Sequence, residues 1–137
     1  MNLAALKNAA ENGNVKIQLE LGYMYLQGNN VPEDNAEALK WFSMAAGQQN
    51  ADAQNCLGEM YQYGYGVSSN DAEAIKWYQK AANGGSANGQ FRLGWMYEKG
   101  RGGLPRDKQK ALLYYKMAAK QGHSNAEMYV TMLEMGM

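Results

Sequence analysis

The side chains that most often carry covalent or metal chemistry are scarce in this sequence. Its 137 residues include one cysteine, Cys56, and one histidine, His123. A single cysteine excludes an internal disulfide and a thiolate metal cage, and a single histidine removes most imidazole-based sites. Cys56 has no basic residue in its own helical turn to activate its thiol, so we expect an inert side chain. His123 follows Gly122 at a predicted helix junction without a nucleophile or acid partner, which favours an exposed turn residue.

Glycine-rich segments and acidic clusters have structural explanations as well. The segments 64–66 and 100–103 resemble phosphate loops, but they lack the lysine and hydroxyl pair of a P-loop and follow no predicted strand. Carboxylates at 33–34 and 71–73 stand where predicted helices begin, and negative charge is stabilised there. The sequence therefore predicts no catalytic residue, no cofactor and no metal ion, and we expect a protein that is not an enzyme.

Length and charge narrow the class of protein further. A chain of 137 residues, 46% of them hydrophobic, suits one domain. The 13 basic and 13 acidic residues cancel, so no nucleic-acid partner is expected. Because the sequence shows neither a secretory signal nor a run of about 18 apolar residues, we expect no membrane insertion and a cytoplasmic location, or a periplasmic one if a leader has been removed.

Other residues recur with a fixed period. The string Leu-Gly-x-Met-Tyr begins at Leu21, Leu57 and Leu93, 36 residues apart. Alanine pairs recur at the same interval, with one extra residue in the third unit, at Ala9-Ala10, Ala45-Ala46, Ala81-Ala82 and Ala118-Ala119. A period of this length is typical of proteins built from one repeated supersecondary unit.

Each unit contains two helical patterns, named here helix A and helix B. Ala53, Leu57, Met60 and Tyr61 lie at i, i+4, i+7 and i+8, on one buried helical face. The predicted A helices are 15–27, 51–63, 87–99 and 124–135, and the predicted B helices are 2–12, 34–47, 70–83 and 107–121.

Capping residues support these boundaries. Asp34, Asn70 and Asp107 are suited to cap B helices, and Glu37 and Glu73 are expected to complete capping boxes. Glycines that tolerate positive φ follow most of the helices, such as Gly28, Gly64 and Gly100 after the A helices. Gln49 replaces the glycine after the helix at 34–47, so we expect that junction to be looser or differently shaped.

Small and large residues at repeated positions predict the core. Gly22, Gly58 and Gly94 each cost a helix roughly 1 kcal/mol relative to alanine, so they are expected where a neighbouring helix approaches closely. Aromatic residues are predicted to fill the space between helices, namely Tyr25, Tyr61, Tyr97, Trp41, Trp77 and Tyr114.

These motifs resemble the SEL-like repeat, a branch of the tetratricopeptide superfamily. The unit at 49–84 matches most closely, while the last helix has Val130, Thr131 and Glu134 in place of the motif leucine, glycine and tyrosine. The resemblance implies an all-α fold, an α-solenoid of antiparallel helix pairs forming one domain over 1–137. About three full repeats, at 13–48, 49–84 and 85–121, are flanked by a helix at each end, at 2–12 and 122–137.

The resemblance also implies a function. Members of this family are usually adaptors, so we expect a non-catalytic module that binds a protein or a peptide. One alternative is an inhibitor or immunity protein that neutralises a toxin. An alternative of another class is a hydrolase resembling the cysteine-rich, penicillin-binding relatives, although their paired cysteines are absent from this sequence.

A contrast between repeated and varied positions predicts the binding surface. Exposed positions that differ between units are free to suit a partner, and on helix A the offsets −5, −1, +2 and +6 from the motif leucine share one face. The resemblance implies that this face, the helix-A stripe, lines the concave side. Predicted partner-binding residues on it are Glu20, Tyr23, Glu59, Tyr63, Arg92, Trp95, Lys99 and Tyr129. The alternative is that Trp95 and Tyr63 merely pack against adjacent helices.

Overall fold

A computed structural model describes residues 2–136, so Met1 and Met137, the last residue of the predicted flanking segment 122–137, lie outside the described residues. Over that range the chain forms eight α-helices and no strand. Their bounds are α1 Leu3–Glu11, α2 Val15–Gln27, α3 Asn35–Gly47, α4 Ala51–Tyr63, α5 Asp71–Asn83, α6 Ala87–Lys99, α7 Lys108–Lys120 and α8 Ser124–Glu134. The predicted helices are thereby confirmed to within about one residue at each end.

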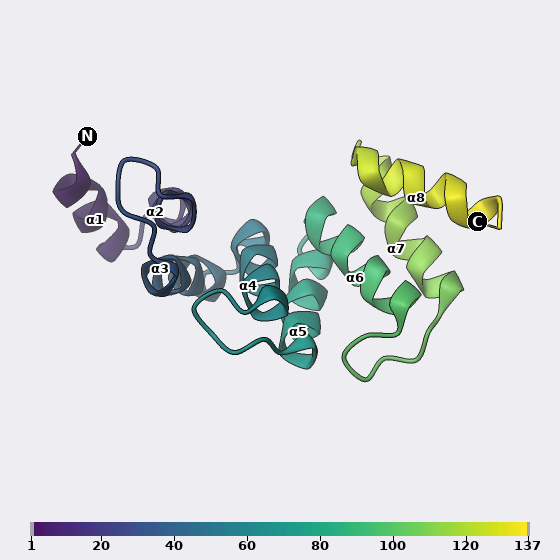
Figure 1. Cartoon of the computed structure of the whole chain (residues 1–137). Helices are drawn as coiled ribbons and strands as arrows, with labels where there is room; N and C mark the ends of the chain where they lie inside the picture. The colour runs from purple at the N-terminus through teal and green to yellow at the C-terminus, as the bar shows by residue number, and fades with distance from the viewer. Residues whose placement is uncertain (1, 137) are drawn as a thin grey trace.

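The helices stack in sequence order along a curved array (Figure 1), with the two termini at opposite ends. Within each repeat an A helix packs against the B helix that follows it, as in α2 with α3, α4 with α5, and α6 with α7. Each B helix also packs against the next A helix, and α4 contacts α6 directly. The predicted all-α solenoid with about three repeats is confirmed.

The B helices have the predicted N-caps but not the predicted capping boxes. The side chain of Asp34 accepts a hydrogen bond from the backbone of Glu37, and Asn70 and Asp107 cap α5 and α7 in the same way. The backbone N–H of Asp34, however, donates to the carbonyl oxygen of Tyr25 at 2.9 Å. The backbone N–H groups of Asn70 and Asp107 likewise donate to carbonyl oxygens of the preceding A helix. These N–H groups are therefore not bonded to the side chains of Glu37 and Glu73, and the prediction of capping boxes was wrong.

The junction at Gln49 has the same shape as the junctions that contain glycine. Gln49 has φ +67°, and Gly85 at the equivalent position has φ +93°. The N–H of Gln49 donates to the carbonyl of Ala46 at 3.0 Å, and that of Gly85 donates to Ala82 at 3.1 Å. The predicted change of shape was therefore wrong: Gln49 adopts the left-handed conformation, which the helices on either side impose.

The motif glycines lie under aromatic rings, as their expected role in close packing requires. A Cβ atom at Gly22 would lie 2.5 Å from the ring of Phe42, and one at Gly58 would lie 2.4 Å from the ring of Tyr78. The third repeat has the same arrangement, with Gly94 under Tyr115 at 2.8 Å. These close approaches explain why glycine is retained inside helices despite its cost in helix stability.

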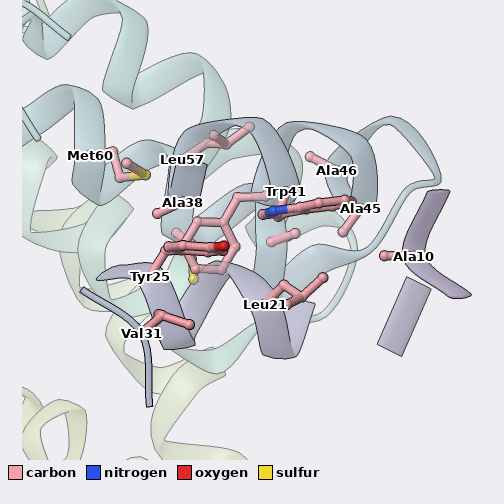
Figure 2. Close-up of a cluster of buried hydrophobic side chains, with 13 residues drawn as sticks. Ala10, Leu21, Tyr25, Val31, Ala38, Trp41, Ala45, Ala46, Leu57 and Met60 are labelled. Atoms are coloured by element: carbon pink, nitrogen blue, oxygen red, sulfur yellow. The ribbon is translucent and has the colours of Figure 1, made fainter. Parts of the chain in front are cut away.

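The aromatic core differs from the predicted one. Phe42, Tyr78 and Tyr115 are fully buried, whereas the preceding residues Trp77 and Tyr114 are only half-buried. Consecutive helical residues point about 100° apart, and helical spacing did not show which of the two faces the glycine. Trp41 is fully buried as predicted, in the cluster of Figure 2, where it lies with Leu21 and Tyr25 of α2 and Leu57 and Met60 of α4.

Candidate functional site

The helix-A stripe runs over four helices, and its side chains are exposed or half-buried except for the buried Cys56. On α2, Glu20 and Tyr23 are exposed, and on α4, Glu59 is half-buried while Tyr63 is 47% exposed. The remaining predicted partner-binding residues are Arg92, Trp95 and Tyr129, which are half-buried, and Lys99, which is exposed.

Three stripe residues from two repeats form one polar cluster. The guanidinium of Arg92 donates a hydrogen bond of 2.9 Å to the hydroxyl of Tyr63 and lies 5.8 Å from the centre of its ring. Its Nε lies 3.8 Å from a carboxylate oxygen of Glu59. Glu59 in turn accepts a hydrogen bond from the side chain of Asn55 at 3.0 Å. These contacts fix Arg92 in one orientation between α4 and α6.

A loop position that was not predicted extends the stripe. In the three full repeats the residue after the C-cap of helix A is Asn29, Tyr65 or Arg101, and each of these contacts the stripe of its own repeat. Arg101 lies 5.4 Å from the ring of Trp95 and is held by a 2.8 Å ion pair with Asp71. In the other repeats, the ring of Tyr65 lies 5.8 Å from that of Tyr63, and Asn29 donates to Gln27 at 2.9 Å. The residue type varies between repeats, so the rule used for helix A would have found this position if applied to the loops.

Tyr23 lies against Cys56, the cysteine of the sequence. The thiol of Cys56 donates to the hydroxyl oxygen of Tyr23 at 3.2 Å, joining the stripes of α2 and α4. Burial raises the pKa of the Cys56 thiol to about 12, so the thiol stays protonated at neutral pH. Burial, followed by the neighbouring Cys56, also raises the pKa of Tyr23. Cys56 is thus a packing residue that positions Tyr23.

The last stripe residue, Tyr129, packs into the core at the end of the array. Its ring meets Phe91 edge-on at 5.1 Å and Tyr115 at 5.3 Å. Trp95 similarly packs against two apolar clusters, one shared by α5 and α6 and the other by α6, α7 and α8. The packing alternative, raised for Trp95 and Tyr63, therefore describes Trp95 better than it describes Tyr63, which is 47% exposed.

His123 is the N-cap of α8, so the prediction of an exposed turn residue was wrong. Its Nδ1 accepts a hydrogen bond from the backbone N–H of Ala126 at 3.1 Å, which places the ring proton on Nε2. Nε2 lies 2.9 Å from Oδ1 of Asn88, and the ring stacks on Phe91 at 4.7 Å. The half-buried ring thus has both nitrogens engaged, and burial lowers its pKa. The sequence signal for this role was its alignment with Asn14, Asn50 and Ser86, which cap the other A helices.

Residues 2–136 contain no group of three His, Cys, Asp or Glu side chains placed to hold a metal ion. In the same range, none of the helices has the length and apolar character that a bilayer crossing requires.

Comparison with known proteins identifies the family. The Sel1 repeat matches this sequence three times in succession, over residues 17–50, 51–86 and 87–123. The chain belongs to the Sel1-repeat family. Relatives in this family are generally non-catalytic scaffolds, and Sel1 repeats generally bind proteins.

Bacterial relatives resemble this Sel1-repeat protein over a third of its length in one case and over most of it in others. Over 45 residues, or 33% of the chain, it is 51% identical to the secretory immunoglobulin A-binding protein EsiB of Escherichia coli O6:H1, of which the match covers 9%. The structure of c5321, a protective antigen of uropathogenic Escherichia coli with an SLR fold, superposes with a TM-score of 0.86 and 42% identity, covering 92% of this chain and 27% of that one. The structure of a Sel1 repeat protein from Oxalobacter formigenes superposes with a TM-score of 0.83 and 36% sequence identity. The match covers 91% of this chain and 51% of that one. The chain therefore spans about half or less of the length of these relatives.

One further structure bears on the immunity alternative. The immunity protein Pa5087 of Pseudomonas aeruginosa superposes with a TM-score of 0.62 and 27% identity, covering 84% of this chain and 43% of that one. The Sel1-repeat fold thus occurs in a protein described as an immunity protein.

Proposed function

We propose that this Sel1-repeat protein is a non-catalytic module that binds a protein or peptide partner on the helix-A stripe and the adjoining loop position. The observation that carries the proposal is the cluster of Arg92, Tyr63 and Glu59. It occupies positions that stacking leaves free to vary, and it presents an aromatic ring and a guanidinium to solvent. Tyrosine, tryptophan and arginine are the residues that most often dominate interface energies.

The cluster is ordered before any partner arrives. An arginine side chain loses rotamer entropy when a partner immobilises it, and that loss weakens binding. Arg92 is already held by Tyr63 and Glu59, and Trp95 is already covered by Arg101. A partner with a carboxylate or carbonyl oxygen could therefore bind the remaining N–H groups of Arg92 at a low entropic cost.

The relatives support a protein as the partner. EsiB is described as binding secretory immunoglobulin A, and its matched segment is 51% identical to this chain. A second candidate function is that of an immunity protein, and the likeness to Pa5087 is the observation that favours it. That candidate predicts that the chain protects cells from a toxin encoded beside its gene. A hydrolase gains no support from Cys56 or His123, because the thiol stays protonated and both ring nitrogens are engaged.

The proposal is tested by capturing proteins from the native cell on the immobilised chain and measuring the affinity of the captured partner. Arg92→Ala and Tyr63→Ala should each weaken binding at least tenfold, which corresponds to about 1.4 kcal/mol. The control is Lys76→Ala on α5, a side chain that is 72% exposed and lies on a B helix. Trp95→Ala is a poorer test, since it also removes packing from two apolar clusters. Unchanged affinity in both stripe variants would show that the partner binds elsewhere.

A further inference from the structure

We propose that a hollow at the end of α5 binds the side-chain amide of a glutamine from a partner protein. The hollow has a volume of about 340 Å³. It is lined by residues of α4, of α5 and of the junctions beside them, namely Gln49, Gln54, Lys80, Asn83 and Gly84. Gln54 stands three positions before Leu57, which places it on the side of α4 opposite the helix-A stripe. The hollow is therefore a separate site from the stripe.

The first and third repeats show which group fits such a position. In the first repeat the side-chain NH2 of Gln48 donates to two acceptors, Oε1 of Gln18 at 2.9 Å and the carbonyl oxygen of Gly13 at 3.2 Å. In the third repeat Gln121 donates to the equivalents of these acceptors at 2.9 and 3.0 Å. A glutamine amide thus binds between the two acceptors in both repeats.

The second repeat keeps both acceptor positions but lacks the glutamine that donates to them. Gln54 and Gln49 are the equivalents of Gln18 and Gly13, and the equivalent of the donor is Gly84. The side chain of Gln54 is only 4% exposed, yet it takes part in none of the hydrogen bonds among residues 2–136, whereas that of Gln18 takes part in two. A buried amide without a protein partner is costly, so Gln54 favours a ligand that supplies one.

The rim of the hollow adds donors for the oxygen of a bound amide. Lys80 stands where the first and third repeats have Met44 and Met117. The side-chain oxygen of Asn83 already accepts a hydrogen bond from Gln79 at 3.1 Å, which leaves its NH2 group to donate. A primary amide therefore finds acceptors for its NH2 and donors for its oxygen. A carboxylate fits less well, because it has no N–H for the two acceptors.

The test is a titration of the isotope-labelled full chain with N-acetylglutamine N-methylamide, followed by NMR. The side chain provides the primary amide of this probe, since its other two amides are secondary. We expect saturable shifts of the side-chain NH2 signals of Gln54 and of the backbone N–H signals of Gly84 and Gly85, with a Kd in the millimolar range. The corresponding methionine and glutamate probes should bind at least roughly tenfold more weakly, because neither has a side-chain N–H.

Three variants assign the binding to the hollow. Gly84→Gln supplies the amide from the chain itself and should abolish the saturable shifts. Gln54→Leu removes one acceptor and should weaken binding at least roughly tenfold. Ala72→Gln is the matched control, because it adds a glutamine at an exposed position of α5 about three turns away, and it should bind the probe like the original chain. Circular dichroism confirms that each variant is folded.

Other outcomes contradict the proposal. These are equal shifts with the methionine probe, tighter binding of the glutamate probe, and a Gly84→Gln variant that binds as well as the original chain. Shifts confined to Tyr63 and Arg92 also contradict it, although they support binding on the helix-A stripe. The failure of one proposal is thereby distinguished from the failure of the other.

Discussion

The hydroxyl of Tyr78 donates a hydrogen bond of 2.6 Å to Oε1 of Gln62, and this bond joins α5 to α4 in the middle of the array. Both side chains are buried, and burial raises the pKa of the Tyr78 phenol, which keeps it a donor. In the third repeat Tyr115 makes the same 2.6 Å bond to Glu98. In the first repeat the equivalent residues are Phe42 and Leu26, which have no polar side-chain atom. In each repeat, therefore, the aromatic residue of helix B and its partner on helix A are either both polar and hydrogen-bonded or both apolar.

Removing the hydroxyl of Tyr78 should destabilise the protein. Tyr78→Phe leaves the buried Oε1 of Gln62 without a donor, which costs about 1–3 kcal/mol in the free energy of unfolding, measured with urea. Adding Gln62→Leu reproduces the pair of the first repeat and should recover most of that loss. A double variant as unstable as the single one would contradict this account. Tyr114→Phe, whose half-buried hydroxyl has only a 3.4 Å contact with Gln79, is the control and should cost less than about 0.5 kcal/mol.

Gln49→Gly should stabilise the protein. An L-residue in the left-handed conformation carries a penalty of about 1–2 kcal/mol, and glycine removes it at the expense of greater freedom in the unfolded chain. We expect a net gain of roughly 0.5–1 kcal/mol in the free energy of unfolding. Gly85→Gln at the equivalent junction is the matched reverse, since a Cβ there meets no atom within 4 Å, and it should lose a similar amount. Loss of stability in Gln49→Gly would show that the glutamine side chain makes a contribution of its own.

The second repeat lacks a glutamine bridge that the other two possess. The side chain of Gln48 donates a hydrogen bond to that of Gln18 at 2.9 Å, and Gln121 donates to Gln90 at the same distance. In the second repeat the residue equivalent to these donors is Gly84. It lines a hollow of about 340 Å³ together with Gln54, the equivalent of the two acceptors. Gly84→Gln should fill this hollow and bond to Gln54.

The expected gain is about 0.5–1.5 kcal/mol in the free energy of unfolding, measured by chemical denaturation. The closest atom to a new Cβ would be the methyl group of Ala51 at 3.0 Å, so a small shift is needed. The variant Gly84→Ala adds the Cβ atom without the amide group, so its free energy of unfolding measures the cost of that shift alone. A gain that persists when Gln54 is replaced by leucine would show that the bond is not its source.

The stability of α8 should depend on pH through His123. Burial lowers the pKa of His123 in the folded chain, so the neutral ring is favoured there, and only the neutral ring accepts the N–H of Ala126. The stabilisation is complete above the unfolded pKa of about 6.5 and is lost as the pH falls through the lower folded value. His123→Asn keeps a cap that does not titrate.

Relative to His123→Asn, the original chain should lose about 1 kcal/mol of stability between pH 7.5 and pH 5, measured by thermal unfolding. Carboxylates titrate equally in both proteins, so the difference reports on the imidazole. Parallel pH profiles would refute the capping role.

The sequence by itself determined the period, the helices and most of their ends. These features depend on interactions within a few residues: the 3.6-residue spacing of apolar positions, a cap such as Asp34 that binds the N–H three residues on, and a glycine such as Gly64 at positive φ. The fixed period also predicted that Gly58 lies in a close contact, because a costly residue kept in every unit needs a packing reason.

Only the tertiary structure decided which partner each residue meets. Trp77 and Tyr78 are adjacent in sequence, and the rotation of α5 against α4 determines that Tyr78 covers Gly58. Arg101 reaches Trp95 and Asp71 because the loop after α6 folds back over two repeats, and His123 meets Asn88 35 residues away. Such contacts depend on the angle and distance between packed helices, which many side chains fix together and which no local pattern contains.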